Sequence, residues 1–561
     1  MPTAPFTVLA ADKLAQEGLD WLASQPDATV LNKPGLTESE YADLLAAGGI
    51  HAMIVRSGIK VTPAMLENPG DLQVIARAGV GVDNIDLPAA TAKGILVVNT
   101  AEASTITTAE LAFTLLMAML RKVGPASRTV YNGGWDRAKF KGRQLHGMTI
   151  GVVGLGRIGR TFAERALAFG MNVVGYDPFV NSDLELGGHT VKTFRDFTDM
   201  LPHIDAVSFH VPKTAETTGM LNAETFKLAK PGLFVVNAAR GGIVDEAALL
   251  EALDHGQCAG AALDVYTSEP PSEDSKLRTH PGILAVPHLG ASTEEAQTAV
   301  SVDAGKACLA YLRGEGITGA VNAGGVRVDL TDKQSAYVAL SDRMATLIAP
   351  MITRGIAEVN IELCGADLAP AAGTIERTVL IGLLRRHFDT PLNVINVADV
   401  AKQRNIKIGA TIRDGDASTP GGMPSAGQLT LTVTGPASAT DANTPEADRV
   451  RRVVGRVYDD GLPRVVEING YPMDMVPAGP MVVIRNEDTP GIIGTVGTTF
   501  GAAGVNIADM TIARRASTDG SGFTALMLLK LDGDAPETLL TELAGKPGIR
   551  KVAAVRLAPL G

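Results

Sequence analysis

The sequence predicts an α/β protein of several domains, in which two parallel-sheet domains are followed by an α+β region and a small ferredoxin-like unit. Three observations support this fold class. Apolar strands alternate with helix-like stretches from residue 7 to about residue 313, and the residues from Met481 onward follow the order βαββαβ. A chain of 561 residues is also too long for one hydrophobic core.

The first hundred residues predict a parallel sheet covered by helices, because short apolar runs alternate there with amphipathic stretches. The expected elements are a helix at Leu14–Ala23 and strands at Thr7–Ala10, His51–Val55, Val74–Ala76 and Leu96–Val98. The apolar stretch that follows, around residues 111–120, is too short to span a membrane. We therefore expect a buried helix at that position.

A second α/β series starts at Met148. Its expected strands are Thr149–Val153, Asn172–Tyr176, Ala206–Phe209, Phe234–Asn237, Gly260–Leu263 and Leu284–Val286, and its expected helices are Arg160–Phe169 and Glu294–Arg313. This series starts well after another α/β domain has begun. We therefore expect the chain to leave the first domain near residue 100, to build the second, and to return near residue 290.

The composition changes after Gly314. The stretch Asp414–Asp448 is rich in Gly, Pro, Ser and Thr and predicts loops between strands. The C-terminal unit is expected to consist of strands Met481–Arg485, Val505–Arg514, Phe523–Leu531 and Val552–Leu557 with helices Ile492–Ala503 and Pro536–Ala544. This order is ferredoxin-like.

Charge and cysteine content exclude several classes of function. The net charge of −11 disfavours non-specific nucleic-acid binding, which needs a basic face. The three cysteines lack the spacing of a metal site or a disulfide framework, so neither is expected. No stretch resembles a signal peptide or is long enough to span a membrane, so we expect a cytoplasmic protein without a membrane partner.

The glycine-rich turn Gly154-x-Gly156-x-x-Gly159 follows a strand and opens a helix. Such glycines permit a tight turn and a close approach of the backbone to a pyrophosphate, and the helix N-terminus attracts the phosphates. Asp177 ends the next strand, where a carboxylate can accept hydrogen bonds from ribose hydroxyls and would repel a 2′-phosphate. We therefore expect NAD rather than NADP as the cofactor.

Three polar residues follow successive expected strands of the second domain: Arg240, Glu269 and His288. The carboxyl ends of parallel strands line the ligand crevice, so these side chains should meet beside the nicotinamide. A histidine can take the hydroxyl proton of a 2-hydroxy acid, and a carboxylate can orient its ring. An arginine can bind the substrate carboxylate. Each residue taken singly could instead be an ordinary surface or loop residue.

Four motifs in this region resemble the D-isomer-specific 2-hydroxyacid dehydrogenases: TIGVVGLGRIGR at 149–160, NAARGGIVD at 237–245, ALDVYTSEP at 262–270 and PHLGAST at 287–293. The resemblance runs from about residue 7 to residue 315. It implies that Arg240, Glu269 and His288 are the catalytic residues. It also implies cofactor contacts at Arg157, Ile158, Asp177, Val80, Val211, Ala238, Ala239, Asp264, Leu289, Gly290 and Ala291.

The segments at 55–57 and 77–84 resemble the substrate-side motifs of family members that act on D-3-phosphoglycerate. This resemblance implies that Arg56, Ser57, Lys60 and Arg77 face the substrate's phosphate and carboxylate. Arg137 lies in a segment, with Trp135 and Lys139, that forms the dimer contact in relatives and can reach the neighbouring active site. The chain departs from the family pattern in one loop, where Ser104 replaces an expected Asn and Glu102 adds a negative charge.

The C-terminal unit resembles an ACT domain, a small module that binds amino acids. On that resemblance Asn486, Asp488 and Asn506 would hold an effector, which we expect to be L-serine. A role in oligomerisation alone is the alternative. The region before it resembles the extra, allosteric-substrate-binding-like domain of long phosphoglycerate-oxidising relatives.

The resemblance implies a discontinuous flavodoxin-like substrate domain (1–100 and 290–318) and a Rossmann NAD-binding domain (101–289). An intervening regulatory domain (319–478) and an ACT domain (479–561) would follow. The expected activity is NAD-dependent oxidation of D-3-phosphoglycerate to 3-phosphohydroxypyruvate by a homodimer or homotetramer. The alternatives are another D-2-hydroxyacid dehydrogenase, such as a hydroxypyruvate, glyoxylate or 2-oxoglutarate reductase, and a non-catalytic dinucleotide-sensing protein.

Overall fold

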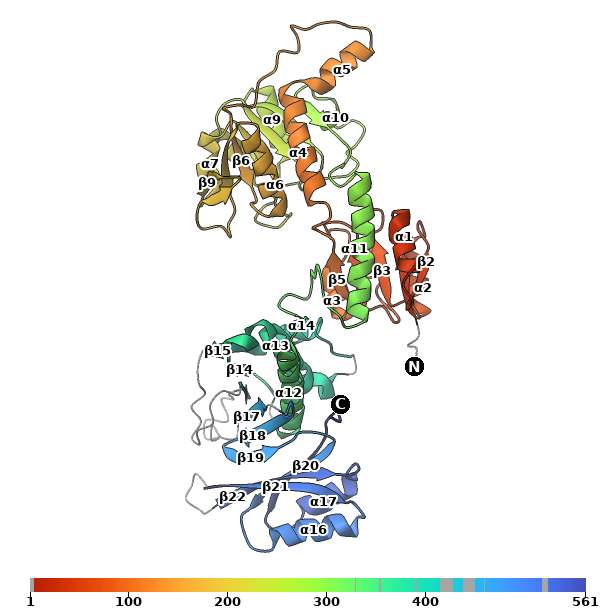
Figure 1. Ribbon diagram of the computed structural model, residues 1–561, viewed down its shortest axis with the longest axis vertical. Coiled ribbons are helices and arrows are strands. Elements are labelled where there is room, and N and C mark those ends of the chain that lie inside the picture. The colour runs from red at the N-terminus through yellow and green to blue at the C-terminus, as the bar shows by residue number, and fades with distance from the viewer. Residues whose placement is uncertain are drawn as a thin grey trace.

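The computed structural model describes residues 5–560 except 328, 353–354, 389–390, 414–426, 437–448, 459 and 517–522. The molecule is elongated and contains four β-sheets, numbered in chain order. Along its length they lie in the order second, first, third and fourth (Figure 1). The predicted fold class is confirmed: the first two sheets belong to α/β units and the last two to α+β units. No helix in the described part of the chain is long and apolar enough to cross a membrane.

The first sheet has five parallel strands in the order β2-β1-β3-β4-β5, which is the flavodoxin-like order. Its strands are β1 (Phe6–Ala10), β2 (Ala28–Asn32), β3 (Ala52–Val55), β4 (Val74–Arg77) and β5 (Leu96–Asn99), and its helices are α1 (Gln16–Ala23), α2 (Glu38–Ala46) and α3 (Leu87–Ala92). Helix α11 (Glu294–Leu312) packs against α1 and β4, so the chain returns to this sheet after building the second one (Figure 1). The residues after α11 stay with the sheet, because Ala320 pairs with Val98 of β5.

The second sheet has the strand order β13-β12-β11-β10-β6-β7-β9-β8, which contains the Rossmann order. Its strands are β6 (Thr149–Val153), β7 (Asn172–Tyr176), β8 (Leu184–Leu186), β9 (His189–Phe194), β10 (Ala206–Phe209), β11 (Leu233–Asn237), β12 (Cys258–Leu263) and β13 (Ile283–Ala285). Its helices are α4 (Thr105–Leu120), α5 (Val123–Tyr131), α6 (Arg157–Ala168), α7 (Phe197–Met200), α8 (Ala223–Leu228), α9 (Glu246–Asp254) and α10 (Lys276–Thr279). The predicted buried helix near residue 111 is α4, which packs against α6 and β12.

The third sheet is mixed, in the order β15-β14-β16-β17-β18-β19. Its strands are β14 (Glu358–Cys364), β15 (Lys407–Arg413), β16 (Gln428–Thr434), β17 (Val450–Val457), β18 (Pro463–Ile468) and β19 (Tyr471–Met475), and its helices are α12 (Asp332–Ile348), α13 (Ala372–Leu384) and α14 (Val397–Gln403).

The prediction of loops over Asp414–Asp448 was wrong in part, because β16 lies inside that stretch. Leu429, Leu431 and Val433 alternate with polar residues and point into the core. This alternation is a strand pattern that the Gly- and Pro-rich composition around it concealed. Residues 414–426 and 437–448 lie outside the described residues, so the structure says nothing of the rest of the prediction.

The fourth sheet is antiparallel, in the order β21-β22-β20-β23 that the βαββαβ pattern predicts. It comprises β20 (Pro480–Glu487), β21 (Ile507–Ala516), β22 (Phe523–Leu531) and β23 (Ile549–Arg556), with helices α16 (Ile492–Ala502) and α17 (Glu537–Ala544). Val483, Leu526 and Leu528 of this sheet belong to the same buried cluster as Leu340 and Val465 of the preceding unit. The third and fourth sheets therefore share one hydrophobic core.

Candidate active site

The glycine-rich turn lies between β6 and α6. Gly154 has φ +91°, and a Cβ there would lie 2.6 Å from the carbonyl oxygen of His210. A Cβ on Gly159 would overlap the carbonyl oxygen of Gly154, whereas a Cβ on Gly156 would meet nothing within 4 Å. Gly154 and Gly159 are therefore needed by the turn itself. Gly156 keeps open the space in front of the helix N-terminus, which fits a pyrophosphate.

Asp177 follows β7 and is bound to the glycine-rich turn. Its Oδ2 accepts a hydrogen bond of 2.8 Å from the Leu155 N–H, and its Oδ1 accepts one of 2.9 Å from the Phe179 N–H. Val211 lies on the other side of the turn, with its Cγ1 2.8 Å from the position of a Cβ on Gly154. The position of Asp177 fits the adenosine side of a dinucleotide, and Ile158 of α6 is partly buried.

The loop after β5 also reaches the turn. Glu102 forms an exposed ion pair with Arg157, the residue that starts α6. Glu102 therefore lies against an expected cofactor residue. Ser104 is fully buried, and its hydroxyl has no hydrogen-bond partner among the described residues.

His288 and Glu269 form the pair that the sequence predicts. The Nδ1 atom of His288 lies 2.7 Å from Oε2 of Glu269, and the Tyr266 N–H donates to Oε1 of the same carboxylate. His288 has φ +52°, a conformation that is uncommon outside glycine. Its side chain is about half exposed, so the ring is held by Glu269 but accessible to solvent.

Asp264 fixes the loop that carries His288. This fully buried carboxylate accepts hydrogen bonds from the N–H groups of Leu289 (2.5 Å) and Gly290 (2.9 Å). Burial raises the pKa of Asp264, while these N–H groups and His288 act in the opposite direction. The next residue, Ala291, accepts a hydrogen bond from Gln297 of α11, which connects this loop to the first domain.

Arg240 follows β11 and extends from the second domain to the first. Its Nε donates a 2.9 Å hydrogen bond to Oδ2 of Asp83, and its Nη1 donates to the carbonyl of Ala239. Asn237 holds the turn by donating to the Arg240 carbonyl, and Ala238 is buried behind it. The guanidinium is thus fixed at the boundary between the domains.

The substrate side of the cleft is basic. Burial, followed by the charges of Arg240 and Arg56, lowers the pKa of Arg77 to about 10. The Nε of Arg77 is buried without a hydrogen-bond partner in the described structure. Three guanidinium groups with an unsatisfied donor among them form a setting in which a bound anion would be stabilised.

The other predicted substrate and cofactor residues of the first domain lie around this cluster. Arg56 is half-buried and donates to the Lys13 carbonyl, while Ser57 and Lys60 are exposed. The Val80 carbonyl accepts a hydrogen bond from Asn99 of β5. A hollow beside α1 and the start of α11 is lined by Ala15, Glu17, Arg56, Ser292, Thr293, Glu294, Gln297 and Thr298.

Arg137 is not brought to this cluster within one chain by any contact. It lies in the segment between α5 and β6, which projects from the end of the molecule (Figure 1). Within the described residues it forms no hydrogen bond or ion pair. Helix α5 buries none of its residues, and Tyr131 and Trp135 are 90% and 79% exposed.

The predicted effector residues have separate partners. Asn486 is buried with its Oδ1 unpaired in the described structure, and Asp488 accepts a 2.6 Å hydrogen bond from Arg514. Asn506 donates to Asp532 at 2.6 Å. The structure therefore places Asn486 and Asp488 at the end of β20 but gives no contact between them and Asn506.

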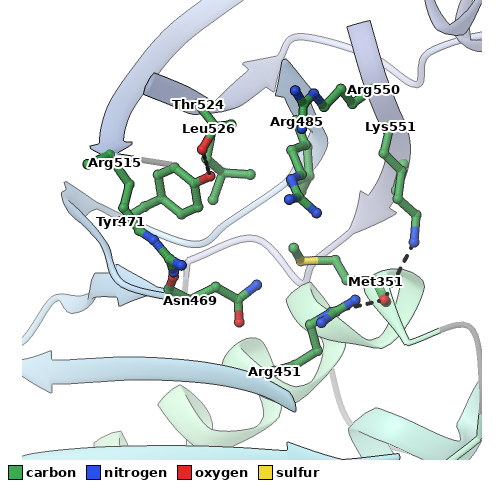
Figure 2. A pocket seen from close by; sticks show the side chains of 13 residues that line it. Met351, Arg451, Asn469, Tyr471, Arg485, Arg515, Thr524, Leu526, Arg550 and Lys551 are labelled. Carbon is green, nitrogen blue, oxygen red and sulfur yellow. Dashed lines mark hydrogen bonds between the residues drawn. The ribbon is translucent and has the colours of Figure 1, made fainter. Parts of the chain in front are cut away.

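A second cavity, which the sequence did not indicate, lies between the third and fourth sheets (Figure 2). Its volume is about 110 Å³, and none of its lining residues in the described structure is acidic. Five basic side chains line it: Arg451, Arg485, Arg515, Arg550 and Lys551. Arg451 and Lys551 both donate to the carbonyl oxygen of Met351 (Figure 2). We call this cavity the basic pocket.

Comparison with known families matches three consecutive parts of the chain. Residues 113–290 match the D-isomer specific 2-hydroxyacid dehydrogenase NAD binding domain. Residues 333–469 match the D-3-phosphoglycerate dehydrogenase intervening domain, and residues 481–548 match the ACT domain. The predicted NAD cofactor is therefore confirmed at the level of the domain family.

Curated relatives match over almost the whole chain. The D-3-phosphoglycerate dehydrogenase of Bacillus subtilis is 36% identical over 98% of this chain and 100% of its own length. That of Methanocaldococcus jannaschii is 35% identical over 98% of this chain and 99% of its own. This chain belongs to the D-3-phosphoglycerate dehydrogenase family. It is thus an enzyme of the D-2-hydroxyacid dehydrogenase class, as the sequence predicts.

Solved structures match the two N-terminal domains of this phosphoglycerate dehydrogenase family member. The TT0316 protein of Thermus thermophilus is 33% identical with a TM-score of 0.52, and covers 56% of this chain and 100% of its own. A glyoxylate reductase from Paecilomyes thermophila is 27% identical with a TM-score of 0.52, and covers 57% and 99%. Both cover little more than half of this chain, whereas the curated relatives extend through the intervening and ACT units.

Sequence analysis missed Asp83 and the basic pocket. Asp83 stands inside the 77–84 motif, but its partner Arg240 is 157 residues away on another domain. The basic residues of the pocket come from two domains and are scattered among exposed arginines in the sequence. Neither the spacing nor the local composition distinguishes them.

Proposed function

We propose that this chain oxidises D-3-phosphoglycerate to 3-phosphohydroxypyruvate with NAD, the first step of L-serine biosynthesis. The observation that carries the proposal is the gathering of Arg56, Arg77 and Arg240, whose charges act on one another. A substrate with both a phosphate and a carboxylate requires several cations. The names of the full-length relatives support the same substrate.

The geometry of the side chains supports a proposed role for each residue. With its Nδ1 proton directed at Glu269, a neutral His288 presents an unprotonated Nε2 that can take the proton of the substrate hydroxyl. Glu269 orients the ring and stabilises the imidazolium that forms. Arg240 binds the carboxylate, and Arg56, Arg77, Ser57 and Lys60 surround the phosphate. When bound, NAD supplies the hydride acceptor.

The cofactor residues support this assignment. Gly154, Gly156 and Gly159 with Arg157 and Ile158 would face the pyrophosphate, and Asp177 would bind the adenosine ribose. The residues that would surround the nicotinamide side are Val80, Val211, Ala238, Ala239, Asp264, Leu289, Gly290 and Ala291. The boundaries 1–100 with 290–318, 101–289, 319–478 and 479–561 are our working division into domains.

The test is NADH formation by the full chain across a panel of D-2-hydroxy acids, with and without L-serine. We expect D-3-phosphoglycerate to give the highest kcat/KM and NAD to be preferred over NADP. A higher kcat/KM with glycolate, D-glycerate or D-2-hydroxyglutarate would overturn the proposed substrate in favour of a glyoxylate, hydroxypyruvate or 2-oxoglutarate reductase. No turnover with any acid would favour a dinucleotide-sensing protein.

L-serine is the proposed effector, bound by Asn486, Asp488 and Asn506 between paired ACT domains. The Oδ1 atom of buried Asn486 has no hydrogen-bond donor in the described structure, and the ammonium group of a bound amino acid could supply one. Serine should lower turnover in the same assay. Unchanged activity and unchanged thermal stability over the whole titration would contradict this proposal and leave oligomerisation as the role of the ACT unit.

The basic pocket supports the predicted allosteric-substrate-binding role of the intervening domain. Burial, together with the charges of Arg451 and Arg485, lowers the pKa of Lys551, so a bound anion would relieve the repulsion. We expect inorganic phosphate to bind there and Lys551→Met to remove that binding step from a calorimetric titration. The exposed Lys227→Met is the matched control. A titration that Lys551→Met leaves unchanged would contradict the role.

The proposed assembly is a homodimer or homotetramer in the cytoplasm. The exposed aromatic residues Tyr131 and Trp135 on and beside α5 form a surface that a second copy could cover, which would bring Arg137 to the partner's cleft. The three cysteines are unpaired and buried, as is usual in a reducing compartment. Sedimentation of Trp135→Ser should show weaker association than the wild type.

A further inference from the structure

Arg240 belongs to the second domain, but part of its environment comes from the first. It follows β11, whereas its partner Asp83 follows β4 of the first sheet. The Nε–Oδ2 hydrogen bond of 2.9 Å therefore crosses between the domains, and the Arg240 side chain is only 25% exposed. The position of this guanidinium depends on both halves of the cleft.

Gly81 lies directly beneath this guanidinium. A Cβ at Gly81 would overlap Nη2 of Arg240 and lie 2.7 Å from Oδ2 of Asp83. The backbone of Gly81 is not in the left-handed region, unlike that of Gly79, whose φ is +143°. A glycine is therefore needed at position 81 because the Arg240 side chain occupies the space of a Cβ, and not because of the backbone conformation.

The charges around Arg240 make a partner necessary. Arg240 and Arg56 both lower the pKa of Arg77, while Asp83 and Asp12 act in the opposite direction. A flexible guanidinium next to two others would turn toward solvent if no carboxylate held it. Asp83 supplies that carboxylate from the substrate side of the cleft.

We propose that Gly81 and Asp83 form a seat on the first domain that positions Arg240 for the substrate carboxylate. The inference rests on the proposed role of Arg240. Asp83 binds Nε, the Ala239 carbonyl binds Nη1, and Gly81 leaves room for Nη2. Asp83 and Gly81 are positioning residues, since they act through Arg240. The position of Arg240 therefore depends on how the two domains are placed against each other.

The test compares Asp83→Ala, Asp83→Asn and Gly81→Ala with the wild type, using Asp43→Ala on the exposed face of α2 as the control. We expect kcat/KM for the hydroxy acid to fall about tenfold to 10²-fold in Asp83→Ala and Gly81→Ala, the loss that a displacement of about 1 Å can cause. Asp83→Asn should lose less, because its amide oxygen still accepts from Nε. The Kd for NAD and the Tm should stay at wild-type values.

A double-mutant cycle with Arg240→Lys separates positioning from a general structural role. A lysine lacks the Nε–H group that Arg240 donates to Asp83. Asp83→Ala should therefore add little further loss of kcat/KM to Arg240→Lys. The proposal would be overturned if the fold-losses in kcat/KM of Asp83→Ala and Arg240→Lys multiplied fully in the double variant. It would also be overturned if Asp83→Ala and Gly81→Ala kept the wild-type kcat/KM. If the wild type does not oxidise D-3-phosphoglycerate, the proposed substrate fails, and the seat is judged on the D-2-hydroxy acid that the wild type oxidises fastest.

Discussion

His288 is held by a hydrogen bond from one side only, and this decides what the residue can do. Glu269 occupies Nδ1, and the Tyr266 N–H fixes Glu269 in turn. The left-handed backbone at His288 is maintained by the hydrogen bond from its N–H to the Asp264 carbonyl. The ring is therefore held in a fixed direction with its other nitrogen accessible, as a general base requires.

Replacement of His288 by Asn should remove the proton acceptor and keep the fold. We expect kcat to fall by about 10²–10⁴-fold, the usual contribution of a general base. NAD binding, followed by the quenching of protein fluorescence, should be retained. A Glu269→Gln variant, which keeps the shape but loses the charge, should lie between the wild type and His288→Asn. NADH production that His288→Asn leaves unaffected would refute the assignment.

Because of Arg77, we expect substrate affinity to change with pH in the alkaline range. Its lowered pKa of about 10 means that the folded protein disfavours its charged form, although it is protonated at neutral pH. Affinity for an anionic substrate should thus be constant between pH 7 and 9 and fall as the pH rises through about 10. Measurement of KM against pH tests this. Arg77→Met should raise KM at neutral pH and flatten that profile, and a profile that it leaves unchanged would contradict the prediction.

Residues that act within one domain could be predicted, and residues that act between domains could not. Arg240, Glu269 and His288 each follow one of three neighbouring parallel strands, and the structure pairs His288 with Glu269 as predicted. Asp83 is seen only when the first domain is placed against the second. The ion pair of Glu102 with Arg157 could not be predicted either, since it depends on how the connecting loop crosses to the glycine-rich turn.

At the scale of elements, the buried strands of the first two sheets were predicted to within a residue or two at each end. β6, β7, β10 and β22 have the predicted bounds, because their continuous apolar runs leave little choice of limits. β2 was not predicted, since each of its residues is exposed or half-buried and its sequence lacks a clear apolar run. Strands at sheet edges carry a weaker sequence signal for this reason.

The glycine-rich turn offers a matched pair of variants. Gly159→Ala places a Cβ on the backbone of Gly154, which cannot move aside, so both the Tm and NAD affinity should fall. Gly156→Ala places its Cβ in open space, so the fold should be unaffected while the NAD Kd rises about tenfold or more. Thermal unfolding and NAD titration distinguish them. Equal effects of both variants on Tm would contradict this account of the turn.

At the scale of the whole molecule, the last two units are packed together through one core, so we expect them to unfold as one body. Their sheets share a hydrophobic cluster, and Tyr471 of β19 is hydrogen-bonded to Thr524 of β22 at 2.6 Å. The link to the first domain is narrower: Asn393 donates to the Gly94 carbonyl, and Ile395 enters the core of the first sheet. The sequence predicted both units but not their common core, because the apolar face of each resembles that of an independent domain.

Arg343 of α12 connects the two units at their centre. Its guanidinium is buried and donates to the carbonyls of Pro477 (2.9 Å), Ala558 (2.6 Å) and Pro559 (2.9 Å), so it clamps the C-terminal segment against α12. Removal of the donor would leave the carbonyl of buried Pro477 without its bond, whereas Ala558 and Pro559 are exposed and their carbonyls can bind water. Since one buried, unsatisfied polar group costs about 1–3 kcal/mol, Arg343→Met should lower the free energy of unfolding by about that amount.

Hydrogen exchange on the full chain tests this connection. In the wild type, the amides of β23 and α12 should exchange at similar rates, because both open only when the shared core opens. In Arg343→Met, β23 should exchange faster than α12. Arg327→Met, which removes an exposed ion pair with Asp329 in the same unit, is the control and should change neither rate, as exposed pairs contribute about 1 kcal/mol or less. If β23 already exchanges independently of α12 in the wild type, the two units do not form one cooperative body, and an anion in the basic pocket could not couple them through a common core.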